Sequence, residues 1–297
     1  MSATAAMPAV HARPRDFLDR NGPLSFGLIL FNWAVVAVCI LAGEFFQHPL
    51  VYILSVWLIG TRMVALAEVI GHDSVHYNLF QRRGLNRWLD FMWFLPLFET
   101  WEGYREAHQR HHNELFTEND PAVQDYKRWG LFEPGRNYFW LWFIRPFLFF
   151  DTPYLVKSVV HGLFTDRLYA LRMASLWVPV LIICALTNTL DILFYYWIIP
   201  YLWSYPALIF WSETGEHYKT TTGQTRNTLG FLERFFISPH NDRYHAIHHR
   251  YASIPWFNLK RATDALMEPV EYTRSSGFLD LYRQFKADVP FLNRPST

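Results

Sequence analysis

Four long apolar segments constrain this chain more than any other feature of its sequence. A helix that crosses a bilayer needs about 20 apolar residues. The segments cover residues 24–43, 50–70, 168–186 and 192–211. The first and fourth carry no charge, whereas the second contains Arg62 and Glu68 and the third contains Arg172. Uncharged runs of this length are typical of membrane spans, so we predict an all-α integral membrane protein with four transmembrane helices.

The connections between the segments indicate which side of the membrane they face. The segments form two pairs, each joined by a short loop, at 44–49 and 187–191, that contains no Lys or Arg. Residues 71–167 carry eleven Lys and Arg, and the part after Trp211 carries eleven more. Because cytoplasmic loops are enriched in Lys and Arg, we expect two transmembrane hairpins with both termini in the cytoplasm. We expect this multi-pass protein in a bacterial-type inner membrane.

The chain is predicted to be a single domain, residues 1–297. No repeat, low-complexity tract or linker divides it. Residues 1–23 form a cytoplasmic tail without the residue order of a cleavable signal peptide. Residues 71–167 and 212–297 lie outside the spans and are expected to form a cytoplasmic cap.

Composition excludes several classes of function. The net charge is +1, from 27 Lys and Arg against 26 Asp and Glu, which argues against nucleic acid as a partner. Cys39 and Cys184 are too few for a CxxC zinc site or a thiolate-bound iron–sulfur cluster.

The histidines are the second informative feature, because nine of the 13 fall into four short groups. These groups are HDSVH at 72–76, HQRHH at 108–112, His217 in SETGEHY, and HAIHH at 245–249. Helical residues at i, i+3 and i+4 share one face, so HxxxH and HxxHH direct their imidazoles to one side. Neutral imidazole binds iron, zinc, copper and nickel well. We therefore predict metal ligands at His72, His76, His108, His111, His112, His217, His245, His248 and His249.

The position of these histidines relative to the spans strengthens the prediction. His72 and His76 lie two and six residues after the second span, and His217 lies six residues after the fourth. If both helices continue, these side chains emerge about 3–9 Å beyond the apolar core, on the cytoplasmic side. Nine ligands are too many for one ion and indicate two. A histidine-rich site at the mouth of a bilayer suits iron and oxygen chemistry on a lipophilic substrate.

At this point the sequence resembles the membrane fatty acid desaturase and hydroxylase superfamily. The matching stretches are GHDSVHYNLF, REAHQRHHNELFTENDP and RYHAIHHRYASIPWFNL. The resemblance covers roughly residues 24–270 and implies an all-α membrane fold with a cytoplasmic helical cap holding two irons. It implies that His217 is the additional ligand before the last histidine box. Without a haem-binding or rubredoxin-like segment, electrons are expected from a separate ferredoxin-like donor.

Several further residues are candidates for the surroundings of the metals. Some family members carry a metal-contacting Asn four residues before the additional histidine, and this chain has Glu213 there, a possible ligand or hydrogen-bond acceptor. Glu216 is expected to face elsewhere. Candidate partners of the ligand rings, or alternatively caps and loop residues, are Asp73, Asn113, Asp120, His240, Asn241 and Asp242. Candidates for a substrate channel are Arg62, Glu68, Trp101 and Tyr104. Arg62 could instead pair with Glu68, and core packing is the default expectation for Trp101 and Tyr104.

The resemblance implies a di-iron enzyme that uses O2 and external electrons to desaturate a fatty acyl chain. Hydroxylation or ketolation of a lipid or carotenoid is the alternative on the same scaffold. A membrane hydrolase or receptor that binds zinc is the alternative of a different class. Chain length, regiochemistry, acyl carrier and oligomeric state are not readable from the sequence.

Overall fold

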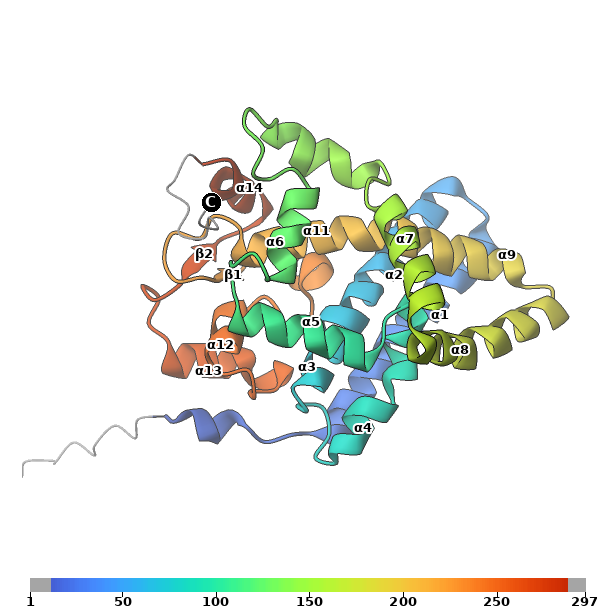
Figure 1. Ribbon diagram of the computed structural model, residues 1–297, viewed down its shortest axis with the longest axis horizontal. Helices are drawn as coiled ribbons and strands as arrows, with labels where there is room; N and C mark the ends of the chain where they lie inside the picture. Colours follow the sequence, from blue (N-terminus) through green and yellow to red (C-terminus); the bar gives the residue numbers. More distant parts are fainter. Residues whose placement is uncertain (1–11, 288–297) are drawn as a thin grey trace, which may run out of the picture.

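The computed structural model describes residues 12–287, and these are mostly helical (Figure 1). Its α-helices are α1 (Gly22–Phe46), α2 (Pro49–Val64), α3 (His72–Val75), α4 (Arg83–Trp88), α5 (Trp101–Asn113), α6 (Pro121–Arg128), α7 (Thr152–Thr165), α8 (Arg167–Leu186), α9 (Leu190–Leu193), α10 (Ile199–Leu202), α11 (Ser204–His217), α12 (His245–Arg250), α13 (Leu259–Leu266) and α14 (Phe278–Lys286). Strands β1 (Arg226–Thr228) and β2 (Thr273–Ser275) pair in parallel.

Four helical stretches are long and apolar enough to cross a membrane, which agrees with the sequence prediction. They cover Gly22–Phe46, Pro49–Val75, Arg167–Leu186 and Leu190–His217. The second runs through α2, a π-helical turn at Ala65–Gly71 and α3, and the fourth runs from α9 to α11. Both helices continue past their apolar parts, as expected, so they carry His72 and His217 directly from the spans.

The second span lies at the centre of this bundle. It is the most buried of the four and packs against α1 on one side and α11 on the other, whereas α8 is the least buried. The second and fourth spans approach each other closely at Gly60, where an added Cβ atom would meet the side chain of Ser204. Small residues allow this kind of contact between membrane helices. The contact fixes the two spans that lead to the histidines.

Side-chain caps set where the helices begin. The Asn21 side chain accepts a hydrogen bond from the Leu24 amide at the start of α1, and Asp166 accepts from Leu168 and Tyr169 at the start of α8. Thr100 caps α5 by accepting from the Gly103 amide. Such caps satisfy amides that have no partner within the helix.

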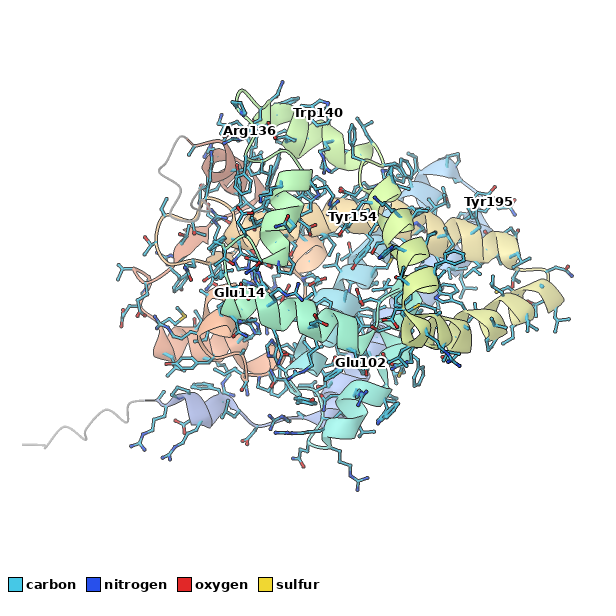
Figure 2. All side chains as sticks on the ribbon, viewed as in Figure 1. Glu102, Glu114, Arg136, Trp140, Tyr154 and Tyr195 are labelled. Atoms are coloured by element: carbon cyan, nitrogen blue, oxygen red, sulfur yellow. The ribbon has the colours of Figure 1, made fainter. Side chains whose placement is uncertain are left out.

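Helices α5, α6, α12, α13 and α14 gather at the end of the bundle where α3 and α11 finish (Figure 1). Helix α5 contacts both α3 and α6, and α12 contacts α13 and β1. Figure 2 marks the two ends of α5 with Glu102 and Glu114. This arrangement brings the four histidine-bearing segments to one place.

Candidate metal centre

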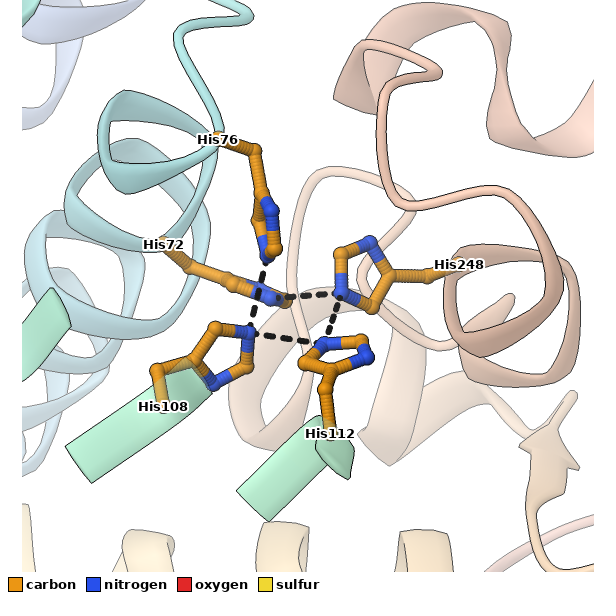
Figure 3. Close-up of side chains that lie close together, drawn as sticks. All are labelled: His72, His76, His108, His112 and His248. Atoms are coloured by element: carbon orange, nitrogen blue, oxygen red, sulfur yellow. Dashed lines mark hydrogen bonds between the residues drawn. The ribbon is translucent and has the colours of Figure 1, made fainter. Parts of the chain in front are cut away.

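The nine histidines of the four sequence groups form two clusters. The first, called the five-histidine group here, consists of His72, His76, His108, His112 and His248 (Figure 3). The second, the four-histidine group, consists of His111, His217, His245 and His249. Within each group the nearest ring nitrogens lie within 4.8 Å of one another. Segments separated by more than 170 positions thus meet at one site.

Each HxxHH motif contributes to both groups. On α5, His108 and His112 enter the five-histidine group and His111 enters the four-histidine group. On α12 the division is reversed, because His245 and His249 enter the four-histidine group and His248 the other. Residues i and i+4 lie one above the other on a helix, whereas i+3 and i+4 are about 100° apart. The paired histidines at the end of each motif therefore face different clusters.

The spacing of the Nε2 atoms fits metal coordination. In the five-histidine group, the Nε2 atoms of His72 and His248 are 2.8 Å apart, those of His76 and His108 2.9 Å, and those of His112 and His248 3.0 Å. Two nitrogens bound at about 2.1 Å and at right angles lie about 3.0 Å apart, against about 3.4 Å in a tetrahedron. Five converging rings and this spacing favour a higher coordination number than that of structural zinc.

Acceptors on the opposite ring nitrogen orient several of these rings. In the π-helical turn, the His72 amide bonds to Ala67 one residue further back than in an α-helix, and the Glu68 carbonyl lies 3.1 Å from His72 Nδ1. His217 Nδ1 lies 3.3 Å from the Gln224 carbonyl. An acceptor at Nδ1 directs the lone pair of Nε2 toward a metal.

Asp120 performs two of the roles that the sequence left open. Its Oδ1 atom lies 2.9 Å from His111 Nδ1 and also accepts from the Ala122 amide at the start of α6, while Oδ2 accepts from the Phe116 amide. It is therefore both a helix cap and a partner of a candidate ligand. Asp242 is the second carboxylate that faces a ring, with Oδ1 3.7 Å from His72 Nδ1.

Burial favours the neutral form of five of these histidines. Desolvation, followed by the charge of neighbouring histidines, lowers the pKa of His76 to about 2 and that of His112 to about 3. The same two causes lower the pKa values of His108, His248 and His249. Neutral imidazole is the form that binds metals, so protons compete little for the site near neutral pH.

The carboxylates around the histidines lack positive partners. Within residues 12–287, none of this set forms an ion pair with Lys or Arg within 4.0 Å: Glu68, Asp73, Asp120, Glu213, Glu216 and Asp242. Buried charges are normally paired or bound to metals. Nine imidazoles beside carboxylates that have no Lys or Arg partner therefore fit two divalent cations, which would supply positive charge there.

A cavity of about 180 Å³ lies against both groups. His72 and His108 line it from the five-histidine group, and His111, His217 and His245 from the other. Its apolar wall consists of Ala107, Pro121, Ala122 and Ile209. The cavity is therefore the place where a substrate carbon could approach both clusters.

Two predicted residues, Glu68 and Tyr104, line this cavity, and the Tyr104 hydroxyl donates to Glu68 Oε2 at 2.6 Å. Glu213 also lines it and accepts from the Tyr126 hydroxyl at 2.9 Å. Glu213 is not among the ligand atoms that lie within 4.8 Å of one another in either histidine group.

The other two channel candidates lie elsewhere. Arg62 does not pair with Glu68, because its guanidinium donates to Asn32 Oδ1 at 3.2 Å and to the Phe235 carbonyl at 3.3 Å. Trp101 is 5% exposed and packs in the core beside Tyr77. Neither lines the cavity, because Arg62 is directed toward Asn32 on α1 and the Phe235 carbonyl, and Trp101 packs in the hydrophobic core that includes the spans.

The remaining candidates hold loops rather than ligand rings. Asp73 accepts from the Trp256 amide, which ties α3 to the loop after α12, and Asn241 donates to the Trp256 carbonyl at 3.4 Å. His240 Nε2 lies 3.3 Å from Asn32 Oδ1 and belongs to neither group. Among the contacts found within residues 12–287, the Asn113 side chain makes no hydrogen bond to a ligand ring.

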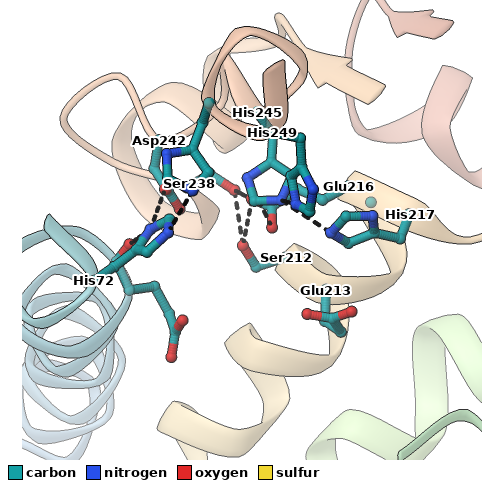
Figure 4. Close-up of polar contacts among 12 residues, drawn as sticks. His72, Ser212, Glu213, Glu216, His217, Ser238, Asp242, His245 and His249 are labelled. Atoms are coloured by element: carbon teal, nitrogen blue, oxygen red, sulfur yellow. Dashed lines mark hydrogen bonds and ion pairs between the residues drawn. The ribbon is translucent and has the colours of Figure 1, made fainter. Parts of the chain in front are cut away.

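Sequence reasoning missed Glu216, which was expected to face elsewhere. It is 6% exposed, and its Oε2 atom lies 3.7 Å from His245 Nδ1 (Figure 4). Its distance from His245 in the sequence hid this contact. The available signal was a charged residue at the end of an apolar span, since an ionisable group there is normally functional.

Comparison with known proteins identifies relatives of the chain. Residues 47–276 match the family described as Fatty acid desaturase. Dihydrorhizobitoxine desaturase of Bradyrhizobium elkanii is 27% identical over 82% of this chain and 75% of its own length. An sn-1 acyl-lipid omega-3 desaturase (ferredoxin) of Nostoc sp. is 25% identical over 74% of this chain and 69% of its own. The corresponding Synechocystis protein is 24% identical over 85% and 76%.

Proposed function

Because the chain belongs to the fatty acid desaturase family, we propose that it is an O2-dependent membrane desaturase that introduces a double bond into a fatty acyl chain. One observation carries the proposal. The two histidine groups lie side by side and face one cavity, whose walls come partly from the second and fourth spans. A lipid-borne chain and a pair of metals can meet there.

The nine histidines are the proposed ligands of two irons, one for each group. When bound, this centre supplies the redox chemistry by which O2, two electrons and two protons take two hydrogens from adjacent carbons, giving an alkene and two waters. The protein orients the ligand rings through Asp120 and the Glu68 carbonyl. It positions the substrate against the apolar wall formed by Ala107, Ala122 and Ile209.

The two tyrosine–glutamate pairs give the cavity a polar side. Tyr104 holds Glu68 close to the five-histidine group, and Tyr126 holds Glu213 close to the other. Each hydroxyl fixes its carboxylate in one orientation. We assign these pairs to the shaping of the cavity, and the adjoining apolar wall to contact with the acyl chain.

The partners and location follow from the same arrangement. Two relatives are named as ferredoxin enzymes, and this chain has too few cysteines for an iron–sulfur cluster of its own. We therefore propose a separate ferredoxin-like electron donor. We propose a multi-pass, single-domain protein of a bacterial-type inner membrane, and the distribution of Lys and Arg supports both termini and the metal centre in the cytoplasm.

Two other functions are alternatives to desaturation at this site. A hydroxylase or ketolase of a lipid or carotenoid would use the same metals, and the desaturase names of the relatives favour desaturation over it. A zinc hydrolase or receptor would need a four-coordinate site. Five histidines with Nε2 spacings near 3.0 Å fit that requirement poorly.

Lipid profiling of a host that expresses the protein tests the reaction. We expect an additional double bond in the acyl chains of cells with the wild-type protein and none with His112→Ala. A new hydroxyl or keto group would replace desaturation by the alternative reaction. An unchanged lipid profile in cells with abundant iron and a matching electron donor would contradict the proposal.

A further inference from the structure

His245 is a candidate ligand whose outer nitrogen, Nδ1, is buried without an acceptor among residues 12–287. Its Nε2 atom lies 2.9 Å from those of His217 and His249, inside the four-histidine group. Its Nδ1 atom is buried and, within residues 12–287, has no hydrogen-bond partner within 3.5 Å. A metal on Nε2 places the ring proton on Nδ1. A buried N–H without an acceptor is costly, so metal binding at this ring requires one.

Glu216 is the carboxylate that faces this nitrogen. Its Oε2 atom lies 3.7 Å from His245 Nδ1, so a small movement would make a hydrogen bond (Figure 4). The other oxygen, Oε1, accepts from the hydroxyls of Ser212 at 3.1 Å and Ser238 at 3.2 Å. The two serines therefore fix Oε1 and leave Oε2 directed at His245.

Asp242 offers a natural comparison on the other side. Its carboxylate, the carboxylate of Glu216 and the His245 ring have ligand atoms within 4.8 Å of one another. Asp242 Oδ1 also lies 3.7 Å from a candidate ligand, at His72 Nδ1. That nitrogen already has the Glu68 carbonyl at 3.1 Å. Losing Asp242 thus leaves His72 with an acceptor, whereas losing Glu216 removes the carboxylate that lies within 4.0 Å of His245 Nδ1.

We propose that Glu216 is the positioning residue of the four-histidine group, accepting the Nδ1 hydrogen of His245 when that group holds its metal. The inference rests on the proposed function for the identity of the metal as iron. It assigns a role that Glu213, three residues earlier on the same helix, does not share, because Glu213 accepts from Tyr126 and is not among the clustered ligand atoms of either histidine group.

The test measures binding of ⁵⁷Fe(II), added without O2, to the metal-free protein in detergent. Wild type is expected to bind two irons that give two Mössbauer doublets. In Glu216→Gln the serines hold the amide oxygen, so the amide nitrogen faces the ring N–H. We expect iron affinity at one of the two positions to fall about 10–100-fold, with loss of one doublet.

Matched variants separate positioning from loss of charge. Asp242→Asn removes the same charge at the same distance from a ring, and Glu213→Gln makes the same substitution on the same helix. We expect both to retain two irons and two doublets. Ser238→Ala keeps the charge and removes one hydroxyl from Glu216, so it is expected to weaken the same position less than Glu216→Gln does.

Two results would overturn the inference. One is a Glu216→Gln protein with both irons bound at wild-type affinity, and the other is an equal loss in Asp242→Asn. If Glu216→Gln does not fold, unchanged iron affinity in Ser238→Ala overturns it instead. The readout is iron binding, so a wild-type protein that binds two irons but forms no double bond contradicts the proposed reaction and not this role of Glu216.

Discussion

His111 and His112 are neighbours in the chain, yet their rings enter different histidine groups. His111 Nε2 lies 3.2 Å from His217 Nε2, and His112 Nε2 lies 3.0 Å from His248 Nε2. The 100° between adjacent helical residues separates them. Helix α5 thus contributes to both clusters and fixes the distance between them.

Single substitutions of these two histidines should have unequal effects. His111→Ala leaves three histidines in its group, whereas His112→Ala leaves four in the other. We expect His111→Ala to lose most of one iron and His112→Ala to retain more metal with weaker binding, as measured by iron content after dialysis. His161→Ala, which removes an exposed histidine of α7, should retain wild-type iron. Equal losses in the two α5 variants would argue against the division into five and four.

Removal of Asp120 should reduce both stability and metal affinity, because this carboxylate caps α6 and faces His111. We expect Asp120→Ala to lower the free energy of unfolding by about 1–2 kcal/mol and iron affinity about 10–100-fold. The matched control is Asp166→Ala. It removes the side chain that caps α8, and that side chain accepts from backbone amides rather than from a histidine ring. Asp166→Ala should lower the free energy of unfolding and leave iron affinity at the wild-type value. Reduced iron affinity in Asp166→Ala would show that cap loss itself disturbs the metals.

The pH dependence of stability offers a test away from the metals. Burial, and then the charge of Arg62, lowers the pKa of His240 to about 3. Unfolding restores a value near 6.5, so between about pH 6.5 and 3 the unfolded chain binds a proton that the folded chain does not. His240 therefore reduces stability as pH falls below about 6.5, by up to about 1.4 kcal/mol per pH unit.

His240→Asn should remove that part of the pH dependence, and Asn tolerates the left-handed backbone at this position (φ 55°). Denaturant unfolding of the metal-free protein at pH 7.5 and 5.5 measures it. Relative to wild type, the variant should gain stability at the lower pH. Glu99→Gln should do the opposite, because burial raises the pKa of Glu99 to about 7. A His240→Asn protein with the same pH dependence as wild type would refute the assignment.

The packing of the central spans can be tested at Gly60. A Cβ atom there meets Ser204, whose hydroxyl donates to the Val56 carbonyl at 2.7 Å. We expect Gly60→Ala to lower the thermal midpoint in detergent, since overpacking typically costs about 1–3 kcal/mol. Gly27→Ala on α1 meets no atom within 4 Å and should leave the midpoint unchanged or raise it. A stable Gly60→Ala protein would mean that the two spans can separate without cost.

The sequence predicts the spans well because each depends on local composition. The apolar runs end within a few residues of the helices in the structure, and the HxxHH spacing indicates which rings share a helix face. The assignment of histidines to two groups was also available from helical geometry, since residues i+3 and i+4 are about 100° apart. Their shared face predicts convergence of the rings and leaves the division into two groups open.

Contacts between distant segments were harder to predict. Arg62 meets Asn32 and Phe235, and Glu216 meets His245 and Ser238, through packing that no spacing rule encodes. Asp120 is different, since it serves as a cap and as a histidine partner at once. The sequence offers both roles as alternatives, and the fold shows that Asp120 performs both at the same time.

The metal content of the purified protein tests the central claim most directly. Iron and zinc are measured together in wild type from cells supplied with both metals. The two histidine groups predict about two irons per chain and little zinc, with iron required for turnover. Stoichiometric zinc, and no iron-dependent turnover after exchange into iron, would contradict a di-iron desaturase.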